Sequence, residues 1–513
     1  MPQHQAASGQ FDRTMNPADG VGSLKNGPRT HPAHAEGAWC ITMPTGTAKM
    51  EIPGNMRGGG FDSDMMDGSP RSPSVSQIID ERPLGRFQRK TITLCALVVV
   101  LDGFDTQSIG FLVPYIADDL TIPLSAFGPV LAAGLLGLMI AAMATGPIAD
   151  RYGRKWTVMV STLTFATFAI ATARSTSLSE LLVFRFLTGL GLGGALPNVI
   201  ALASEYAPRR LLRTLVSALS GGMAVGALVA GLASSVMIPR WGWRAVLYLG
   251  GALPILLALL LFKGLPESVR FLTVRGRDPA RIARILGQIS PELANGPTVP
   301  PPASITIQAA GTPVARLFTE GRARFTILLW IVFFMNLLTL YFIISWLPAL
   351  LRQSGMESSA GVTAISLFSV AGFAGAVLEG PLISRGNAHK MLLAQFIASA
   401  TLVASMALIT SSSAIMAITF LLGLCVNGVQ AGLNAICAGF YPTAIRSTGL
   451  GWALAVGRIG SVVGPWLAGV LLTNAWTPRQ IFLAGAVPAT CGALAIVLAS
   501  IGGAPVRGLA EEQ

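Results

Sequence analysis

The chain has 513 residues, of which 52% are hydrophobic and only 12% are charged, whereas soluble domains carry roughly 25% charged residues. This composition excludes an ordinary water-soluble globule. The formal net charge is +12, which in a soluble protein would favour nucleic-acid binding but in a membrane protein indicates basic cytoplasmic loops, so we expect a protein of the lipid bilayer with no nucleic-acid partner.

Residues 1–86 form a segment rich in Gly, Pro, Ser, Asp and Met. It lacks the apolar core of a signal peptide and cannot bury enough surface to order itself, so we expect it to be disordered. A functional tail is one alternative. Another is that translation begins at Met56, Met65 or Met66.

Twelve apolar stretches follow, each long enough to cross a hydrocarbon core of about 30 Å. The first six lie near 91–115, 124–147, 156–173, 178–205, 212–238 and 244–263. The second six lie near 324–351, 360–382, 391–410, 412–440, 446–473 and 479–501. They predict an all-α integral membrane protein with a first half over 87–263, a basic, Pro-rich cytoplasmic linker over 264–323, a second half over 324–501 and a cytoplasmic tail over 502–513.

Basic residues in the short loops predict the orientation of the chain, because such residues accumulate on the cytoplasmic side. On one side the loops carry Arg151, Arg154, Lys155, Arg209, Arg210, Arg213, Arg385, Lys390 and Arg446. The other side has Asp118 and Asp119 and only scattered arginines. Both termini are therefore expected in the cytoplasm.

The two halves repeat at a single offset of 234 residues. This offset relates Gly146 to Gly380, Pro147 to Pro381, Gly189 to Gly423, Pro208 to Pro442, and Asp102 to Asn336. Parallel repeats are typical of transporters in which one half rocks against the other around a substrate near the bilayer midplane. The repeat therefore predicts a transporter built from two parallel six-helix halves.

Few charged residues lie deep inside the predicted spans, where each costs about 2.5 to 3.5 kcal/mol and usually faces a cavity or a partner. Asp102 and Asp105 share one face of the first helix, since they are three residues apart. At about 1.5 Å per residue, Arg185 lies level with Asp105, and Arg458 lies level with Asp102. This layer predicts a proton-coupling site, although four charges that only neutralise each other are the simpler alternative.

The segment GPIADRYGRKW after the second span is the most specific motif in the chain. It resembles the loop signature of the major facilitator superfamily, in which this loop latches the two halves together. The resemblance implies that Asp150 contacts a basic residue at a neighbouring helix end, with Arg446 as the candidate. The latch residues would be Gly146, Asp150, Arg151, Gly153, Arg154, Glu205 and Arg446. The second copy, GPLISRGNAHK, has Ser384 where an acid is expected.

Four further segments resemble the aromatic acid:proton symporters of that superfamily, over about Phe87 to Ile501. They are LDGFDTQSIGF, GLGLGGALPNVIALASEYAP, FFMNLLTLYFIISWLPALLRQSG and YPTAIRSTGLGWALAVGRIGSVVGP. That family takes up benzoate-like acids with protons. Its functional residues map onto Asp102, Asp105, Arg185, Glu205, Arg446 and Arg458. The fifth span has GMAVGALVAG in place of a GPxxGG motif, which argues against drug:proton antiporters.

The leading hypothesis is import of an aromatic carboxylic acid, of the benzoate or hydroxybenzoate type, by proton symport across the bacterial cytoplasmic (inner) membrane. Asp102 and Asp105 would carry the proton, and Arg458 would grip the carboxylate with its two-pronged guanidinium. The other candidates for the substrate site are Arg185, Asn336, Trp330, Phe334 and Tyr341. For the three aromatic residues, packing in the core is the simpler alternative to contact with the substrate ring.

Two alternatives remain open. A proton-coupled symporter in the same fold could carry a non-aromatic organic acid or another small metabolite, and a membrane sensor without net transport is a remote possibility. Membrane enzymes and metal or haem sites are disfavoured, because no histidine lies in a predicted span and no two cysteines have metal-site spacing. We expect no cofactor and a monomer.

Overall fold

A computed structural model describes residues 83–275, 279–289, 314–385, 388–442 and 445–501, all within one compact unit, 71–513. Residues 1–82, the tail 502–513 and most of the linker's second half lie outside the described residues. The predicted disorder of the first segment therefore stays a prediction.

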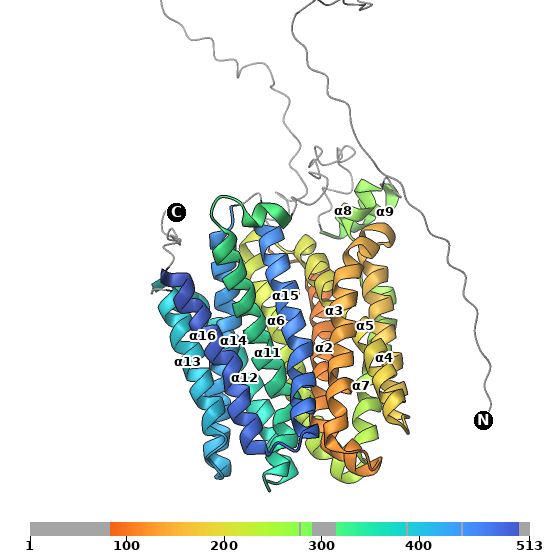
Figure 1. The fold of residues 1–513 in the computed structure, drawn as a ribbon. Coiled ribbons are helices and arrows are strands. Elements are labelled where there is room, and N and C mark those ends of the chain that lie inside the picture. Colours follow the sequence, from red (N-terminus) through yellow and green to blue (C-terminus); the bar gives the residue numbers. More distant parts are fainter. Residues whose placement is uncertain (1–82, 276–278, 290–313, 386–387, 443–444, 502–513) are drawn as a thin grey trace, which may run out of the picture. The chain divides into compact units, whose positions relative to one another are not determined.

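The described part of the chain is helical, and Figure 1 shows its long helices running side by side. The first half comprises α2 (Arg86–Asp119), η1 (Leu124–Ala126), α3 (Phe127–Tyr152), α4 (Arg154–Ala173), α5 (Leu178–Tyr206), α6 (Arg209–Trp241) and α7 (Trp243–Gly264). The second half comprises α11 (Ala323–Gln353), α12 (Ser358–Arg385), α13 (Ala388–Ser405), α14 (Ser412–Phe440), α15 (Arg446–Thr473) and α16 (Pro478–Ile501). These are the helices that the apolar stretches predict.

Eleven of the described helices are long and apolar enough to cross a membrane. The remaining predicted span, 391–410, corresponds to α13, which has 18 residues and ends at Ser405. This short helix contains the polar residues His389, Lys390 and Gln395, and it packs against α14 and α16 within the bundle. Eleven of the twelve predicted spans are thus found as candidate membrane helices among the described residues, and the twelfth corresponds to the shorter helix α13.

The same helix pairs pack together in both halves. In the first half α3 packs on α5, α2 on α6 and α4 on α7, and in the second half α12 packs on α14, α11 on α15 and α13 on α16. Glycines allow equivalent close contacts: a methyl group on Gly189 would overlap the carbonyl oxygen of Gly134, and one on Gly423 would overlap that of Phe368. Both relations obey the 234-residue offset, so the halves are structural repeats.

The linker contains helices that the sequence did not predict. These are α8 (Val269–Val274), α9 (Pro279–Ile289) and η2 (Val314–Phe318). Ile285 and Leu286 of α9 are buried, and Ile285 packs in an apolar cluster with Leu94 of α2. The linker therefore covers the first half with apolar residues spaced along a short amphipathic helix.

The two halves contact each other through α2 with α11, α3 with α15, and α6 with α12. At the ends of α2 and α11, Arg352 Nη2 lies 2.6 Å from Asp118 Oδ2, and the Arg352 guanidinium also lies 5.4 Å from the ring centre of Tyr115. Asp118 and Arg352 are themselves 234 residues apart. Equivalent positions of the two repeats therefore pair at this end of the bundle, which we call the Asp118 end.

The opposite end of α3, the Asp150 end, is more exposed. Met143 and Tyr152 of α3 are 64% and 59% exposed, respectively, and a methyl group added to Gly146 would have no neighbour within 4 Å. The described contacts between the halves thus include an ion pair at the Asp118 end, whereas α3 presents apolar side chains to open space at the Asp150 end.

Candidate functional site

Asp102 and Asp105 lie buried on α2, with 2% and 0% of their surface exposed. Gly103, between them, lies directly against the backbone of Met223 on α6, so α2 and α6 approach closely at this level. Two carboxyl groups are therefore held in the interior of the first half, away from both ends of the bundle.

Asp105 forms a buried ion pair with Arg185 of α5. Arg185 Nη1 lies 3.2 Å from Asp105 Oδ2, and the side chains are only 5% and 1% exposed. The structure brings together the two residues that the sequence places at one depth. Removal of one partner from such a pair leaves an uncompensated buried charge and typically costs about 3 to 5 kcal/mol.

Asp102 has a different environment. Its Oδ1 accepts a hydrogen bond of 3.2 Å from the Thr106 hydroxyl group, one helical turn further along α2. Among the described residues Asp102 has no ion pair, although the charges of Asp105 and Arg458 act on it from a greater distance. The two acids thus differ: Asp105 is neutralised by direct contact, and Asp102 is not.

Arg458 reaches from α15 toward α11. Its Nη1 donates a 3.0 Å hydrogen bond to the hydroxyl oxygen of Tyr341. Gly457 and Gly460 lie against the α11 backbone near Phe333 and Phe334, which lets α15 pack closely enough for this contact. Within the described part of the chain no carboxylate pairs with Arg458, so its guanidinium keeps donors for an anion.

A cavity lies between α2, α3, α5 and α11. Its polar wall consists of Thr106, Arg185, Tyr341 and Ser345, and its remaining wall is formed by leucines, isoleucines and Gly134. The space is narrow, with room for about one water-sized molecule. The hydrogen-bond partners of both Asp102 and Arg458, namely Thr106 and Tyr341, face this cavity, so it connects the two groups.

Other predicted substrate residues lie elsewhere. The buried Asn336 donates a 2.9 Å hydrogen bond to Gln430 of α14. Trp330 stacks on Trp452 at 5.9 Å, and neither it nor Phe334 lines the cavity. The structure therefore brings Arg185 and Tyr341 to the cavity but leaves Asn336, Trp330 and Phe334 outside its wall. Arg458 is not part of the wall either, and it contacts the wall through Tyr341.

Several polar groups of the site were missed by the sequence reasoning. Thr106 follows Asp102 by four residues, and this spacing could have indicated the contact. Ser345 and Gln430 gave no signal, because single hydroxyl and amide groups are common in membrane helices. Glu379 lies within the predicted span 360–382 and should have been counted among the intramembrane acids.

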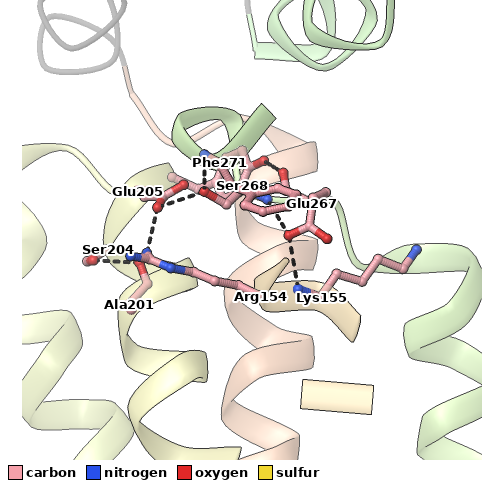
Figure 2. Close-up of polar contacts among 9 residues, drawn as sticks. Arg154, Lys155, Ala201, Ser204, Glu205, Glu267, Ser268 and Phe271 are labelled. Atoms are coloured by element: carbon pink, nitrogen blue, oxygen red, sulfur yellow. Dashed lines mark hydrogen bonds and ion pairs between the residues drawn. The ribbon is translucent and has the colours of Figure 1, made fainter. Parts of the chain in front are cut away.

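A polar cluster fixes the loop after α3 at the Asp150 end (Figure 2). Arg154 Nη1 lies 2.5 Å from Glu205 Oε1, which also accepts a 2.9 Å hydrogen bond from the Ser268 hydroxyl group. Glu267 Oε1 accepts hydrogen bonds from the backbone N–H groups of Lys155 and Ser268. These five residues, the Glu205 cluster, join the start of α4, the end of α5 and the start of the linker, and none of them belongs to the second half.

The predicted contact between Asp150 and Arg446 is not present in this conformation. Asp150 is exposed, and its backbone carbonyl accepts a 3.1 Å hydrogen bond from Arg275. Arg446 instead donates to the backbone carbonyl of Tyr441. The side chain of Ser384 lies outside the described residues, and Arg151 is exposed beside Asp150. The latch between halves therefore remains a prediction for another conformation.

We expect Gly153→Ala to lower the yield and thermal stability of the folded protein. Gly153 has φ +104°, and an added methyl group would overlap the Glu267 carboxylate. Backbone strain of this kind costs about 1 to 3 kcal/mol. Thermal unfolding in detergent checks the prediction, with Gly146→Ala as the matched control, because its methyl group would meet open space. Equal losses for the two variants would contradict it.

The comparisons with known proteins agree with this architecture. The model of the major facilitator superfamily matches residues 95–419 and 364–509. The 4-hydroxybenzoate transporter PcaK of Pseudomonas putida is 38% identical, covering 83% of this chain and 96% of that protein. The chain belongs to the aromatic acid family of the major facilitator superfamily. It is a multi-pass membrane transporter and not an enzyme.

Other relatives extend this comparison. A gallate transporter of Pseudomonas putida is 36% identical, with 82% of this chain and 94% of that protein covered, and a benzoate transport protein of Acinetobacter baylyi is 32% identical, with 83% and 93% covered. The solved structure of a bacterial homologue of the lysosomal transporter Spinster has a TM-score of 0.61 at 16% identity, covering 81% of this transporter and 97% of that chain. This likeness concerns the fold alone.

Proposed function

We propose that this transporter imports an aromatic carboxylic acid of the benzoate or hydroxybenzoate type together with protons, by alternating access. The observation that carries the proposal is the different pairing of four charges: Asp105 forms an ion pair with Arg185, whereas Asp102 and Arg458 form no ion pair with any described residue. Relatives named for transport of 4-hydroxybenzoate, gallate and benzoate support the substrate class.

Charge balance explains why a proton would accompany the substrate. The two acids and two arginines sum to zero, so an entering carboxylate adds one negative charge in a site of low dielectric. Protonation of Asp102 cancels that charge, and each ligand then lowers the cost of binding the other. Asp102 is the better carrier of the two acids, because a proton on Asp105 would leave Arg185 without its partner.

Arg458 is the proposed carboxylate ligand. Its guanidinium can donate two parallel hydrogen bonds to a carboxylate, and it is hydrogen-bonded to Tyr341, which lines the cavity. The leucine and isoleucine wall suits an aromatic ring, with Ser345 and Thr106 available to a ring substituent. Because the cavity is narrow here, admission of the substrate requires the halves to move apart.

The movement would alternate between the two ends of the bundle. The Asp118–Arg352 pair and the close approach of Gly128 to Gly469 hold the Asp118 end together. From the loop charges we assign the Asp150 end and both termini to the cytoplasm of a bacterial inner membrane. Opening of the Asp118 end would then admit substrate from outside, and the transporter would act as a monomer.

A competition experiment tests the substrate class. Uptake of labelled 4-hydroxybenzoate by cells expressing the chain should be inhibited by unlabelled benzoate, protocatechuate or gallate and unaffected by a non-aromatic acid such as succinate. Strong inhibition by succinate alone would favour the alternative, a symporter of non-aromatic acids. Specific binding of labelled 4-hydroxybenzoate without any net uptake would favour a sensor.

We expect Arg352→Asp to slow uptake several-fold by placing two carboxylates opposite each other at the Asp118 end. The native pair is partly exposed, at 35% and 63%, so its own contribution is about 0 to 1 kcal/mol and the repulsion acts by favouring the open end. The double variant Asp118→Arg with Arg352→Asp restores the pair and should recover uptake. A double variant as slow as Arg352→Asp alone would show that attraction between the charges is not what matters.

A further inference from the structure

A second buried acid site lies in α12, apart from the cavity. Glu379 is only 1% exposed. Its Oε2 accepts a 2.7 Å hydrogen bond from Gln395 Nε2 of α13. Its Oε1 has no hydrogen-bond partner among the described residues, and the same holds for Gln395 Oε1. Two neighbouring side chains thus each bury an acceptor oxygen without a donor among the described residues, and such an arrangement destabilises the folded protein.

The site is built into the packing of three helices. A methyl group added to Gly432 of α14 would lie 2.7 Å from Glu379 Oε1, and one added to Gly428 would lie 3.0 Å from Oε2. Leu392 and Ile383 also lie beside Gly432. The two glycines therefore make room for the carboxyl group, and apolar side chains surround its unpaired oxygen.

No ion pair of Glu379 is present within the described residues. The titratable group facing it from α14 is Cys425. From α13 the contact is the neutral Gln395, and the titratable residues of that helix, His389 and Lys390, lie in its first turn. On α12 itself Arg385 follows six residues later, about 240° around the helix axis, so it starts from a different face; its side chain lies outside the described residues.

The first half contains the same site without an acid. At the 234-residue offset, Thr145, Ser161 and Gly194 correspond to Glu379, Gln395 and Gly428. A methyl group on Gly194 would lie 2.9 Å from Thr145 Cγ2 and would also overlap the Ser161 hydroxyl group. The fold therefore accommodates neutral hydroxyl-bearing side chains at these positions and does not require a negative charge there.

We propose that Glu379 binds a proton permanently. Its side chain is then a neutral carboxylic acid that is hydrogen-bonded to the Gln395 amide. A proton on Glu379 Oε1 converts this unpaired acceptor into a donor. The other oxygen of the pair that lacks a partner, Gln395 Oε1, can then accept a hydrogen bond from it. Rotation of the terminal groups then closes two hydrogen bonds, N–H to Oε2 and O–H to the amide oxygen. This proton stays in place and is separate from the transported one.

Thermal unfolding of the full-length protein in detergent tests the proposal through its pH dependence. The folded state holds a proton at pH 8 that the unfolded chain releases, so the folded state binds more protons and stability falls as pH rises. Glu379→Gln removes this loss while it keeps the shape. We expect the melting temperature of Glu379→Gln to exceed that of the wild type at pH 8. The difference between variant and wild type should be larger at pH 8 than at pH 5 by about 2 °C or more.

The control and a second readout make the outcome decisive. Glu357→Gln changes an exposed acid in the loop before α12 and should match the wild type at both pH values. Infrared spectra at pH 8 should show a protonated-carboxyl carbonyl band that Glu379→Gln loses, while proton-driven uptake persists. A Glu379→Gln protein that fails to fold, is less stable at pH 8, or keeps the full band would overturn the proposal, because a neutral acid tolerates its amide isostere.

Discussion

Replacement of Asp102 by Asn is expected to leave a folded transporter that exchanges substrate across the membrane but no longer accumulates it. Asn keeps the size of the side chain and can still accept the Thr106 hydrogen bond, yet it cannot carry a proton. Because Asp102 has no ion pair among the described residues, its loss strands no buried cation. Accumulation driven by a pH gradient should fall at least tenfold, to the equilibrium level, while counterflow of labelled substrate persists.

Asp105→Asn is the informative counterpart. This change leaves the Arg185 guanidinium buried without its partner, at a typical cost of about 3 to 5 kcal/mol, so we expect less folded protein and a lower melting temperature. Both variants can be compared by detergent-extracted yield and by uptake. If Asp102→Asn still accumulates substrate while a well-folded Asp105→Asn does not, the roles of the two acids must be exchanged.

Arg458→Lys is expected to raise the substrate concentration for half-maximal uptake about tenfold, with little loss of folded protein. Lysine keeps the positive charge but lacks the planar fork that binds both carboxylate oxygens, and one lost charge-assisted hydrogen bond of about 1.5 kcal/mol corresponds to about tenfold in affinity. Tyr341→Phe, which frees Arg458 from its hydrogen bond, should give a smaller rise. Titration of the purified protein with 4-hydroxybenzoate measures both.

Arg185→Lys provides the contrast, since Arg185 also lines the cavity but is held by Asp105. A lysine here weakens the pair and should alter the pH dependence of uptake more than substrate affinity. Unchanged binding in Arg458→Lys together with abolished binding in Arg185→Lys would reverse the two assignments.

The sequence predicted the fold because the bilayer requires long apolar spans and because the internal repeat recurs along both halves. Apolar length located the helices, and the 234-residue offset located the repeat, which the structure shows again in the Asp118–Arg352 pair. The pairing of Asp105 with Arg185 also agrees with the sequence, which placed the two residues at a similar depth in the bilayer.

Other features depended on rotation about helix axes and on polar contacts between distant segments, which depth does not specify. Trp330 and Phe334 lie on α11 with Tyr341, yet only Tyr341 faces the cavity. The Glu205 cluster depends on Glu267 and Ser268, whose partners lie more than 60 residues away. The Asp150–Arg446 contact was expected from resemblance, but in this conformation each residue has another partner.

The most direct test of the proposed function is uptake of labelled 4-hydroxybenzoate into proteoliposomes that contain the purified chain and an imposed pH gradient, acidic outside. Proton symport predicts a transient internal concentration well above the external one, its collapse when a protonophore is added, and no such rise with Asp102→Asn. Full accumulation in the presence of the protonophore would contradict proton coupling.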